Sequence, residues 1–301
     1  MPLLKEEAEK LSNNSLERGI IEEIIDRDAL FALLPFKSVT GKAYVYNREK
    51  TLGSVATLAP NGSIAESAAT FDEVTSYLRI IAGDVDVDNF INETMSDTND
   101  QTAIQIAAKA KTMNRKFREL LITGDNSGDA TQFDGVAKLV TAGQTIEAGT
   151  NGAALTLSML DELKDAVPNG ADVIMMRPGT LRAWKALVRA SGGTTPIHQQ
   201  LSNLTGSEVP AHEGTPIIVN DFVPGDVTQG TNDATCSIYA MRLGLGDGLH
   251  GIFGGDRAGA RFERVGTVQN KDAVRYRAKW YCGLALKSTK SLAAVKGVTN
   301  I

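Results

Sequence analysis

Apolar residues recur at helical spacing over residues 3–34, with acidic residues on the opposite face and a break near Gly19. Pro35 ends the pattern, because proline does not continue a helix. The pattern predicts a helical segment that precedes every core-forming part of the chain. Two interpretations stay open: a surface helix packed on its own domain, or an arm whose apolar stripe docks on a neighbouring molecule.

The pattern becomes extended from Lys37 to Phe71. Residues 43–46 are strand-like, and Asn-Gly-Ser at 61–63 signals a turn. Residues 54–59 between them are small and only weakly apolar. A hairpin with so few bulky side chains is marginal in water by itself. We therefore expect it to pack on a neighbouring copy, with packing on its own chain as the alternative.

A long strand is predicted over residues 73–91. Asp84, Asp86 and Asp88 alternate along it, so their carboxylates share one face. Three aligned carboxylates have the chemistry to bind a hard cation. Alternation on a solvent-facing strand is the simpler interpretation, and we adopt it.

A long helix is predicted next. Asp-Thr-Asn-Asp at 97–100 supplies N-cap chemistry, the helix continues to Ile122, and Gly124 suits the C′ position. Its basic residues fall mainly in the C-terminal half, where they favour the helix dipole. We interpret them as a solvated face rather than a phosphate site; they are Lys109, Lys111, Arg115, Lys116 and Arg118.

Beyond the turn-rich segment 123–134, helices and strands alternate. Helices are predicted over 155–166 and 180–190, the second begun by Pro178. We expect loops over 191–213 and 224–233. Short strands are predicted at 172–176, 215–219, 237–241 and 251–253, a long strand at 273–286, and a closing segment at 288–298.

Composition narrows the class of protein. The 301 residues are 42% hydrophobic, enough for a substantial core in one or two lobes. Only 6% are aromatic and 29 are glycine, which favours turns and extended segments over a dense enzyme core. The formal net charge of -5 gives no general attraction for nucleic acid, whose binding depends on basic clusters. Such a protein can enclose DNA without adhering to it.

Few residues are candidates for catalysis or metal binding. His198, His212 and His250 each lie in a loop-like context without a paired ligand at helical spacing. Residues 246–251 match the letters GxGxxG, but residues 252–255 suggest strand and turn where a nucleotide site requires a helix. We therefore assign no catalytic, cofactor-binding or metal-binding residue, and we expect no cofactor.

The cysteines, the N-terminal residues and the hydropathy of the chain bear on the cellular compartment in which the protein resides. Cys236 and Cys282 lie far apart, and we interpret both as reduced thiols. The first residues turn acidic at once, so we expect no signal peptide. No apolar run approaches the ~20 residues that span a bilayer, so we expect no membrane partner.

The order of the elements resembles that of the tailed-bacteriophage major capsid protein, whose fold encapsulin shells share. Local phrases occur in the family's order: Leu-Leu-Ile-Thr-Gly-Asp at 120–125 with Phe-Asp-Gly-Val at 133–136, the strand and helix at 172–180, Gly-Thr-Pro at 214–216, and the strand at 274–286. The resemblance implies an α+β fold. Its parts would be an N-terminal arm at 1–40, an extended hairpin loop at 41–72, a peripheral domain with a spine helix at 73–127 and 266–301, and an axial α/β domain at 128–265.

The resemblance also implies a function: self-assembly into hexamers and pentamers of an icosahedral shell around phage double-stranded DNA. The arm and the hairpin would contact neighbouring copies, and scaffolding, portal and decoration proteins would be partners. The protein would assemble in the host cytoplasm and reside in the virion. An encapsulin-like compartment is the alternative of the same type, and a cytosolic α/β enzyme is the alternative of another class. Some relatives crosslink through a lysine, but Lys42 and Lys50 in the hairpin have no assignable partner.

Overall fold

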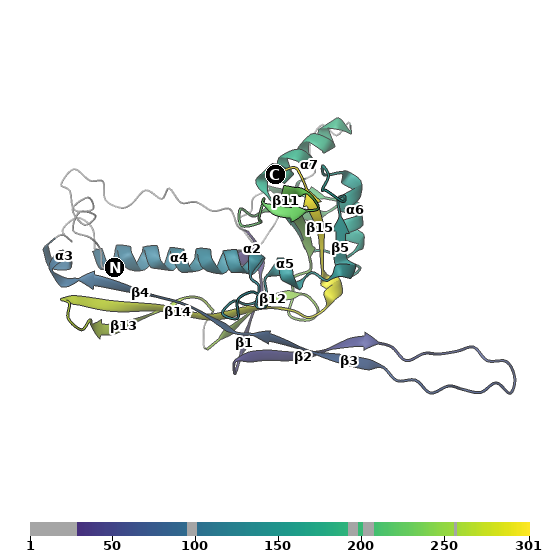
Figure 1. Cartoon of the computed structure of the whole chain (residues 1–301), viewed down its shortest axis with the longest axis horizontal. Helices are drawn as coiled ribbons and strands as arrows, with labels where there is room; N and C mark the ends of the chain where they lie inside the picture. The colour runs from purple at the N-terminus through teal and green to yellow at the C-terminus, as the bar shows by residue number, and fades with distance from the viewer. Residues whose placement is uncertain (1–28, 95–100, 192–197, 201–207, 256–257) are drawn as a thin grey trace.

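The structure is a computed structural model, and it describes residues 29–94, 101–191, 198–200, 208–255 and 258–301. Most of the predicted N-terminal helix and the predicted N-cap at 97–100 lie outside these ranges. Figure 1 shows three parts: a helix lying along a sheet, a second lobe of helices and strands, and a hairpin that extends away from both. In the part of the chain that the structure describes, no helix is both long and apolar enough to span a bilayer.

The first sheet has five strands and is built around β14. The strand order is β1-β12-β14-β13, and β4 also pairs with β14 in antiparallel register. The predicted strand at 273–286 is confirmed as β14. The strands are β1 (Phe36–Val39), β4 (Arg79–Asp88), β12 (Leu249–Gly254), β13 (Arg261–Thr267) and β14 (Ala273–Leu286).

Helix α4 (Gln101–Thr123) covers one face of this sheet, which confirms the predicted spine helix (Figure 1). Phe117 is fully buried, and its ring centroid lies 4.3 Å from that of Trp280 on β14. The buried stripe occupies the C-terminal half of the helix, because only that half faces the aromatic cluster. Ala107 and Ala108, in the N-terminal half, are exposed.

Gly124 follows the helix as expected, but for a different reason. Its backbone does not adopt the left-handed conformation of a C′ glycine. A Cβ at this position would lie 2.3 Å from the Phe133 carbonyl oxygen and 2.6 Å from that of Leu120. The Gly124 carbonyl accepts a 2.8 Å hydrogen bond from Gly135 N–H. Glycine is therefore required because two backbone segments approach each other closely.

The second sheet has eight strands in the order β5-β15-β11-β6-β9-β8-β7, with β10 paired to β11. Its central strand β6 is buried throughout because both faces are covered. Helices α6 (Leu157–Asp165) and α7 (Pro178–Ala190), both predicted, pack on the face that carries Ile174. The strands are β5 (Thr145–Glu147), β6 (Val173–Met176), β7 (His198–Gln200), β8 (Glu208–His212), β9 (Thr215–Val219), β10 (Val227–Gln229), β11 (Asn232–Met241) and β15 (Leu292–Val298).

Three sequence predictions about loops and strands are wrong. The expected loop at 191–213 contains β7 and β8, and the expected loop at 224–233 contains β10 and the start of β11. These strands are short and polar, and cross-strand backbone hydrogen bonds hold them without an apolar alternation. The expected strand at 73–91 is interrupted at Leu78, where the hairpin ends and β4 begins, and it ends in helix α3 (Asn89–Thr94).

The sheets also differ from the expected domain boundaries. Strands β12 and β13 were expected in the axial domain for most of their length, yet both belong to the sheet of β14. Strand β15 was expected in the peripheral domain, yet it pairs with β11 in the eight-stranded sheet. Pairing partners far apart in the sequence decide these memberships. The division into peripheral and axial domains otherwise stays a prediction.

Strands β2 (Ala43–Thr51) and β3 (Thr70–Tyr77) form the predicted hairpin. They pair in antiparallel register from Ala43↔Tyr77 to Thr51↔Thr70. Residues 52–69 continue beyond the paired region without strand structure and reverse direction at Asn61, whose φ is +70°. Short helical segments complete the fold: α2 (Leu30–Leu33), α5 (Val136–Leu139), η1 (Ala142–Gln144) and η2 (Thr289–Ser291).

Candidate functional site: the projecting hairpin and the sheet at its base

The far part of the hairpin extends away from the rest of the described chain (Figure 1). Its larger apolar side chains face solvent, which is unusual for a compact monomer because a contiguous apolar surface marks an interaction site. Val55 is 98% exposed and Ile64 84% exposed. The other exposed apolar residues of the hairpin are Val45, Leu52, Leu58, Phe71 and Tyr77.

The near part of the hairpin is anchored to the end of β14. The Tyr46 hydroxyl donates a 2.6 Å hydrogen bond to the Leu286 carbonyl oxygen. Arg48 Nε donates to the Lys287 carbonyl oxygen at 2.6 Å, and Arg48 Nη2 also donates to Leu286. These bonds set the direction in which the hairpin leaves the body of the protein.

A buried histidine lies under the same strand. His250 on β12 is fully buried, and its ring centroid lies 5.9 Å from that of Tyr44 on β2. Burial lowers the pKa of His250, and the charges of Lys287 and Lys37 lower it further. Burial opposes ionisation of Tyr44, but a 3.0 Å hydrogen bond from Lys37 Nζ and the charge of Lys287 lower its pKa overall. The base of the hairpin therefore sits in a positively charged environment.

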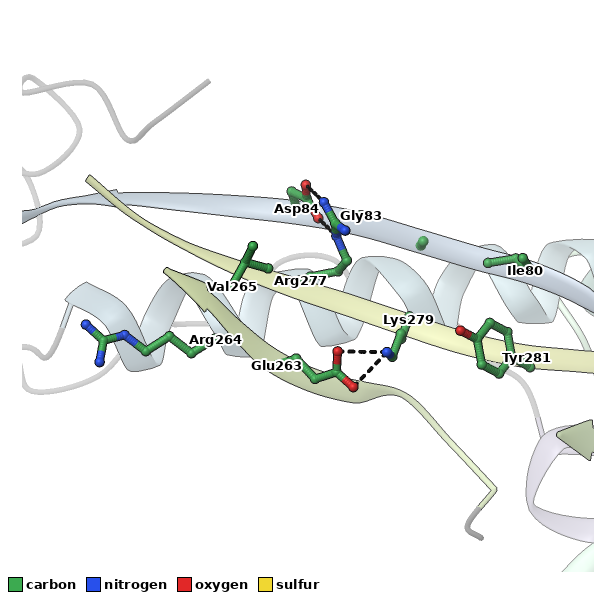
Figure 2. A pocket seen from close by; sticks show the side chains of 10 residues that line it. Ile80, Gly83, Asp84, Glu263, Arg264, Val265, Arg277, Lys279 and Tyr281 are labelled. Carbon is green, nitrogen blue, oxygen red and sulfur yellow. Dashed lines mark hydrogen bonds and ion pairs between the residues drawn. The ribbon is translucent and has the colours of Figure 1, made fainter. Parts of the chain in front are cut away.

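The three aspartates of β4 have ligands from the chain itself. Asp84 accepts paired hydrogen bonds from Arg277 at 2.8 and 2.9 Å (Figure 2). Asp86 accepts a similar pair from Arg275 at 2.6 and 2.7 Å. These hydrogen bonds lower the pKa of both carboxyls, against a smaller opposing effect of burial. Asp88 instead accepts from Phe90 N–H at 2.9 Å, at the start of α3. The carboxylates share a face as expected, but arginines take the place of a cation.

The histidines do not lie in loops, which corrects our expectation. His198 lies in β7, His212 in β8 and His250 in β12. His212 Nε2 lies 2.7 Å from Asp161 Oδ1 of α6, a pairing that the sequence analysis missed because the two residues are far apart in sequence. Glu213 lies close to both, with spacing that a metal ion could use.

Lys164 forms an ion pair with Glu213, one of the carboxylates of this cluster. Its Nζ lies 2.8 Å from Glu213 Oε2 and also donates to the Glu213 carbonyl oxygen at 3.0 Å. The charge of Lys164, through this hydrogen bond, lowers the pKa of Glu213. A cation already occupies the carboxylate that a metal would need, so the cluster is an ion-pair network joining α6 to the β8–β9 turn.

Other candidates are also located. Residues 246–251 form a turn that leads into strand β12 and not into a helix, as expected. Cys236 and Cys282 are free and buried, and burial raises the pKa of both thiols.

Solved structures of an encapsulin and of capsid proteins share this fold. The encapsulin of the holo-SrpI complex from Synechococcus elongatus PCC 7942 matches with a TM-score of 0.74 and 22% identity, covering 99% of this chain and 96% of that one. The capsid of the empty GTA particle matches with a TM-score of 0.71 and 15% identity, covering 96% of each chain. The capsid of Myoviridae phage XM1 matches with a TM-score of 0.64 and 11% identity, covering 95% and 97%. The fold is thus that of shell-forming capsid and encapsulin proteins.

The sequence itself identifies the family. The model of the phage capsid family matches residues 11–297, so the chain belongs to the phage capsid family. No curated protein matches the chain. The chain is accordingly a major capsid protein, a structural component of the virion shell that associates with copies of itself.

Proposed function

We propose that copies of this chain assemble into hexamers and pentamers of an icosahedral shell that encloses phage double-stranded DNA, and that the hairpin joins neighbouring copies. The observation that carries the proposal is the projecting segment 52–69, whose apolar side chains have no cover in the described chain. In a shell, each hairpin can lie across an adjacent copy and bury these side chains there.

The free energy expected for each hairpin contact is suited to reversible assembly. Burying a valine or isoleucine side chain contributes about 1.5–3 kcal/mol, so Val55 and Ile64 together supply a modest contact. Closed symmetric assemblies repeat such a contact at every subunit. Weak single contacts allow a misplaced copy to dissociate, while closure of the shell stabilises the whole.

The same proposal covers the contents of the shell and the other proteins that would bind it. The net charge of -5 allows the shell to surround DNA without sequence-specific binding. We propose scaffolding and portal proteins as partners, with decoration proteins on the outside, and assembly in the host cytoplasm. Membership of the phage capsid family supports this role over that of an α/β enzyme.

A truncation tests the hairpin's role. Thr51 and Thr70 are register partners, with 2.6 Å between their hydroxyl oxygens, so Asn-Gly can replace residues 52–69 as a two-residue turn. The anchoring residues Tyr46 and Arg48 remain. We expect a folded protein with unchanged circular dichroism that forms no shells in negative-stain microscopy. Shells at wild-type yield from this variant would refute the role of the hairpin.

A matched pair of substitutions sharpens the test. Val55→Ser with Ile64→Ser keeps the hairpin length and removes only apolar contact. We expect the thermal stability of unassembled protein to be unchanged, because both side chains are exposed there. The concentration needed for assembly should rise about tenfold or more, given about 1.5–3 kcal/mol for each buried side chain.

An encapsulin-like compartment is the second candidate, favoured by the fold match to an encapsulin. The contents of particles purified from the native source distinguish the two functions. Packaged double-stranded DNA supports the virion shell. Particles that contain a single cargo protein and no DNA would support the compartment instead.

A further inference from the structure

A basic pocket lies at the root of the hairpin, between the turn that precedes β2 and the junction of β3 with β4. It has a volume of about 600 Å³, and its lining includes Lys42, Arg79 and Arg261. We name it the root pocket. None of its described lining residues is acidic.

Among the described residues, Arg79 and Arg261 donate hydrogen bonds to neutral acceptors, and the Asp129 carboxylate acts on Arg79 from outside the lining of the pocket. Arg79 Nε donates to the Gln132 carbonyl oxygen at 3.1 Å, and its Nη2 donates to the Asn126 side-chain oxygen. Arg261 Nη2 donates to the Gly254 carbonyl oxygen at 3.4 Å. The Lys42 ammonium has no hydrogen-bond or ion-pair partner among the described residues. Lys42, Arg79 and Arg261 thus line one hollow whose described lining contains no carboxylate, although the Arg79 guanidinium is bonded to Asn126 and Gln132, which lie outside that lining.

The adjoining hollow of the same sheet shows the opposite pattern. There Arg277 pairs with Asp84, and Lys279 Nζ lies 2.7 Å from Glu263 (Figure 2). The two hollows share Ile80 and Tyr281 on their border. Two of the three basic residues that line the adjoining hollow, Arg277 and Lys279, are therefore paired with carboxylates, and Arg264 is the exception, whereas no basic residue of the root pocket has an ion pair among the described residues. Like charges lining a concave surface concentrate the local potential and attract an anion.

We propose that the root pocket binds a carboxylate side chain of a second copy of this chain, an inference that rests on the proposed shell assembly. Arginine and lysine bind carboxylates through charge-assisted hydrogen bonds. The border of the pocket is apolar and aromatic, because Ile80 is 66% exposed beside Tyr281. Arginine, tyrosine and apolar contact are typical of the centre of protein–protein interfaces. A free inorganic anion would use the cations but not this border.

Zero-length crosslinking of wild-type shells tests the proposal directly. Carbodiimide joins a lysine amine to a carboxylate only where the two are in contact. Shells are assembled from a mixture of ¹⁴N- and ¹⁵N-labelled protein and crosslinked, and their peptides are analysed by mass spectrometry. We expect a mixed-isotope peptide that joins Lys42 to an aspartate or glutamate. Its absence, or a Lys42 crosslink confined to single-isotope peptides, overturns the proposal.

Variants supply an independent measurement. Lys42→Gln with Arg261→Gln is expected to leave circular dichroism unchanged and to raise the assembly threshold concentration about a hundredfold or more, since two charge-assisted bonds are lost. Lys116→Gln is the control, because Lys116 pairs with Glu119 on the exposed face of α4 and should leave the threshold unchanged. An unchanged threshold for the double variant counts against the pocket.

Two further outcomes separate the possible explanations. The first outcome is that phosphate, at constant ionic strength, raises the melting temperature of unassembled wild type but not of the double variant. If the mixed-isotope crosslink is also absent, this result assigns the pocket to a small anion and overturns the proposal that it binds a carboxylate side chain. Failure of the wild type to form any shell would reject the proposed function itself. If shells form but lack the crosslink, only the root-pocket proposal fails.

Discussion

Arg48 should control how firmly the hairpin is held to the body of the protein. Its guanidinium donates hydrogen bonds to the carbonyl oxygens of Leu286 and Lys287 at the end of β14. A hydrogen bond to a charged group contributes about 1.5–3 kcal/mol. The site is partly exposed, so we expect about 2 kcal/mol for the two bonds together, near the lower limit of that range.

Arg48→Gln should therefore raise the equilibrium constant for local opening of the hairpin about 30-fold, since about 1.4 kcal/mol corresponds to a factor of ten. Hydrogen exchange of the β2 and β3 amides in unassembled protein measures this constant. Tyr46→Phe removes the hydrogen bond donated to Leu286 and a longer one, at 3.4 Å, that the hydroxyl accepts from Arg48, and it should raise exchange about fivefold or more. Exchange in β11 should not change, because that strand lies in the other sheet.

Lys50→Gln is the matched control on the same strand. Among the described residues Lys50 pairs only with Asp72, at 3.0 Å, and both side chains are more than half exposed, at 58% and 53%. Exposed pairs of this kind contribute roughly 0–1 kcal/mol, so exchange should change little. If Arg48→Gln leaves hairpin exchange within about twofold of wild type, the arginine anchor is not what holds the hairpin, and the reasoning fails.

Three further predictions concern the body of the protein. Phe117→Ala should lower the free energy of unfolding by about 3–5 kcal/mol in denaturant titration, whereas the exposed Phe90→Ala should change it little. Gly124→Ala should lower it by roughly 1–3 kcal/mol or more, because the added methyl group meets backbone oxygens that cannot move aside; an unchanged midpoint would contradict the close approach. The lowered pKa of His250 predicts that stability falls as pH drops below about 6.5, since the unfolded chain then binds a proton that the folded chain does not. In His250→Gln this pH dependence should be weaker in denaturant midpoints measured from pH 7.5 to 5.

The strongest periodic patterns allowed correct prediction of several elements. The helix ending near Ile122, the strand at 273–286, the buried strand β6 and the hairpin were all predictable. Each depends on local periodicity, on turn residues or on an apolar run, and these properties are contained in a short window of sequence. The order of these elements was enough to indicate the capsid fold.

Tertiary structure decided what depends on distant partners. Strands β12 and β13 belong to the sheet of β14, and β15 belongs to the eight-stranded sheet. Hydrogen-bonding partners that lie far away in the sequence decide this membership. From the sequence, Asp84 and Asp86 were interpreted as solvent-facing, with cation binding as the alternative. The register of β4 on β14 places Arg277 and Arg275 opposite them.

The hairpin shows the same division between sequence and structure. Its residues indicated two strands with too little apolar bulk to be stable alone. The direction in which it projects depends on Tyr46 and Arg48 reaching the end of β14, some 240 positions further along the chain. No local sequence pattern encodes a contact across that separation, because the contact exists only once the hairpin and the sheet of β14 have both formed.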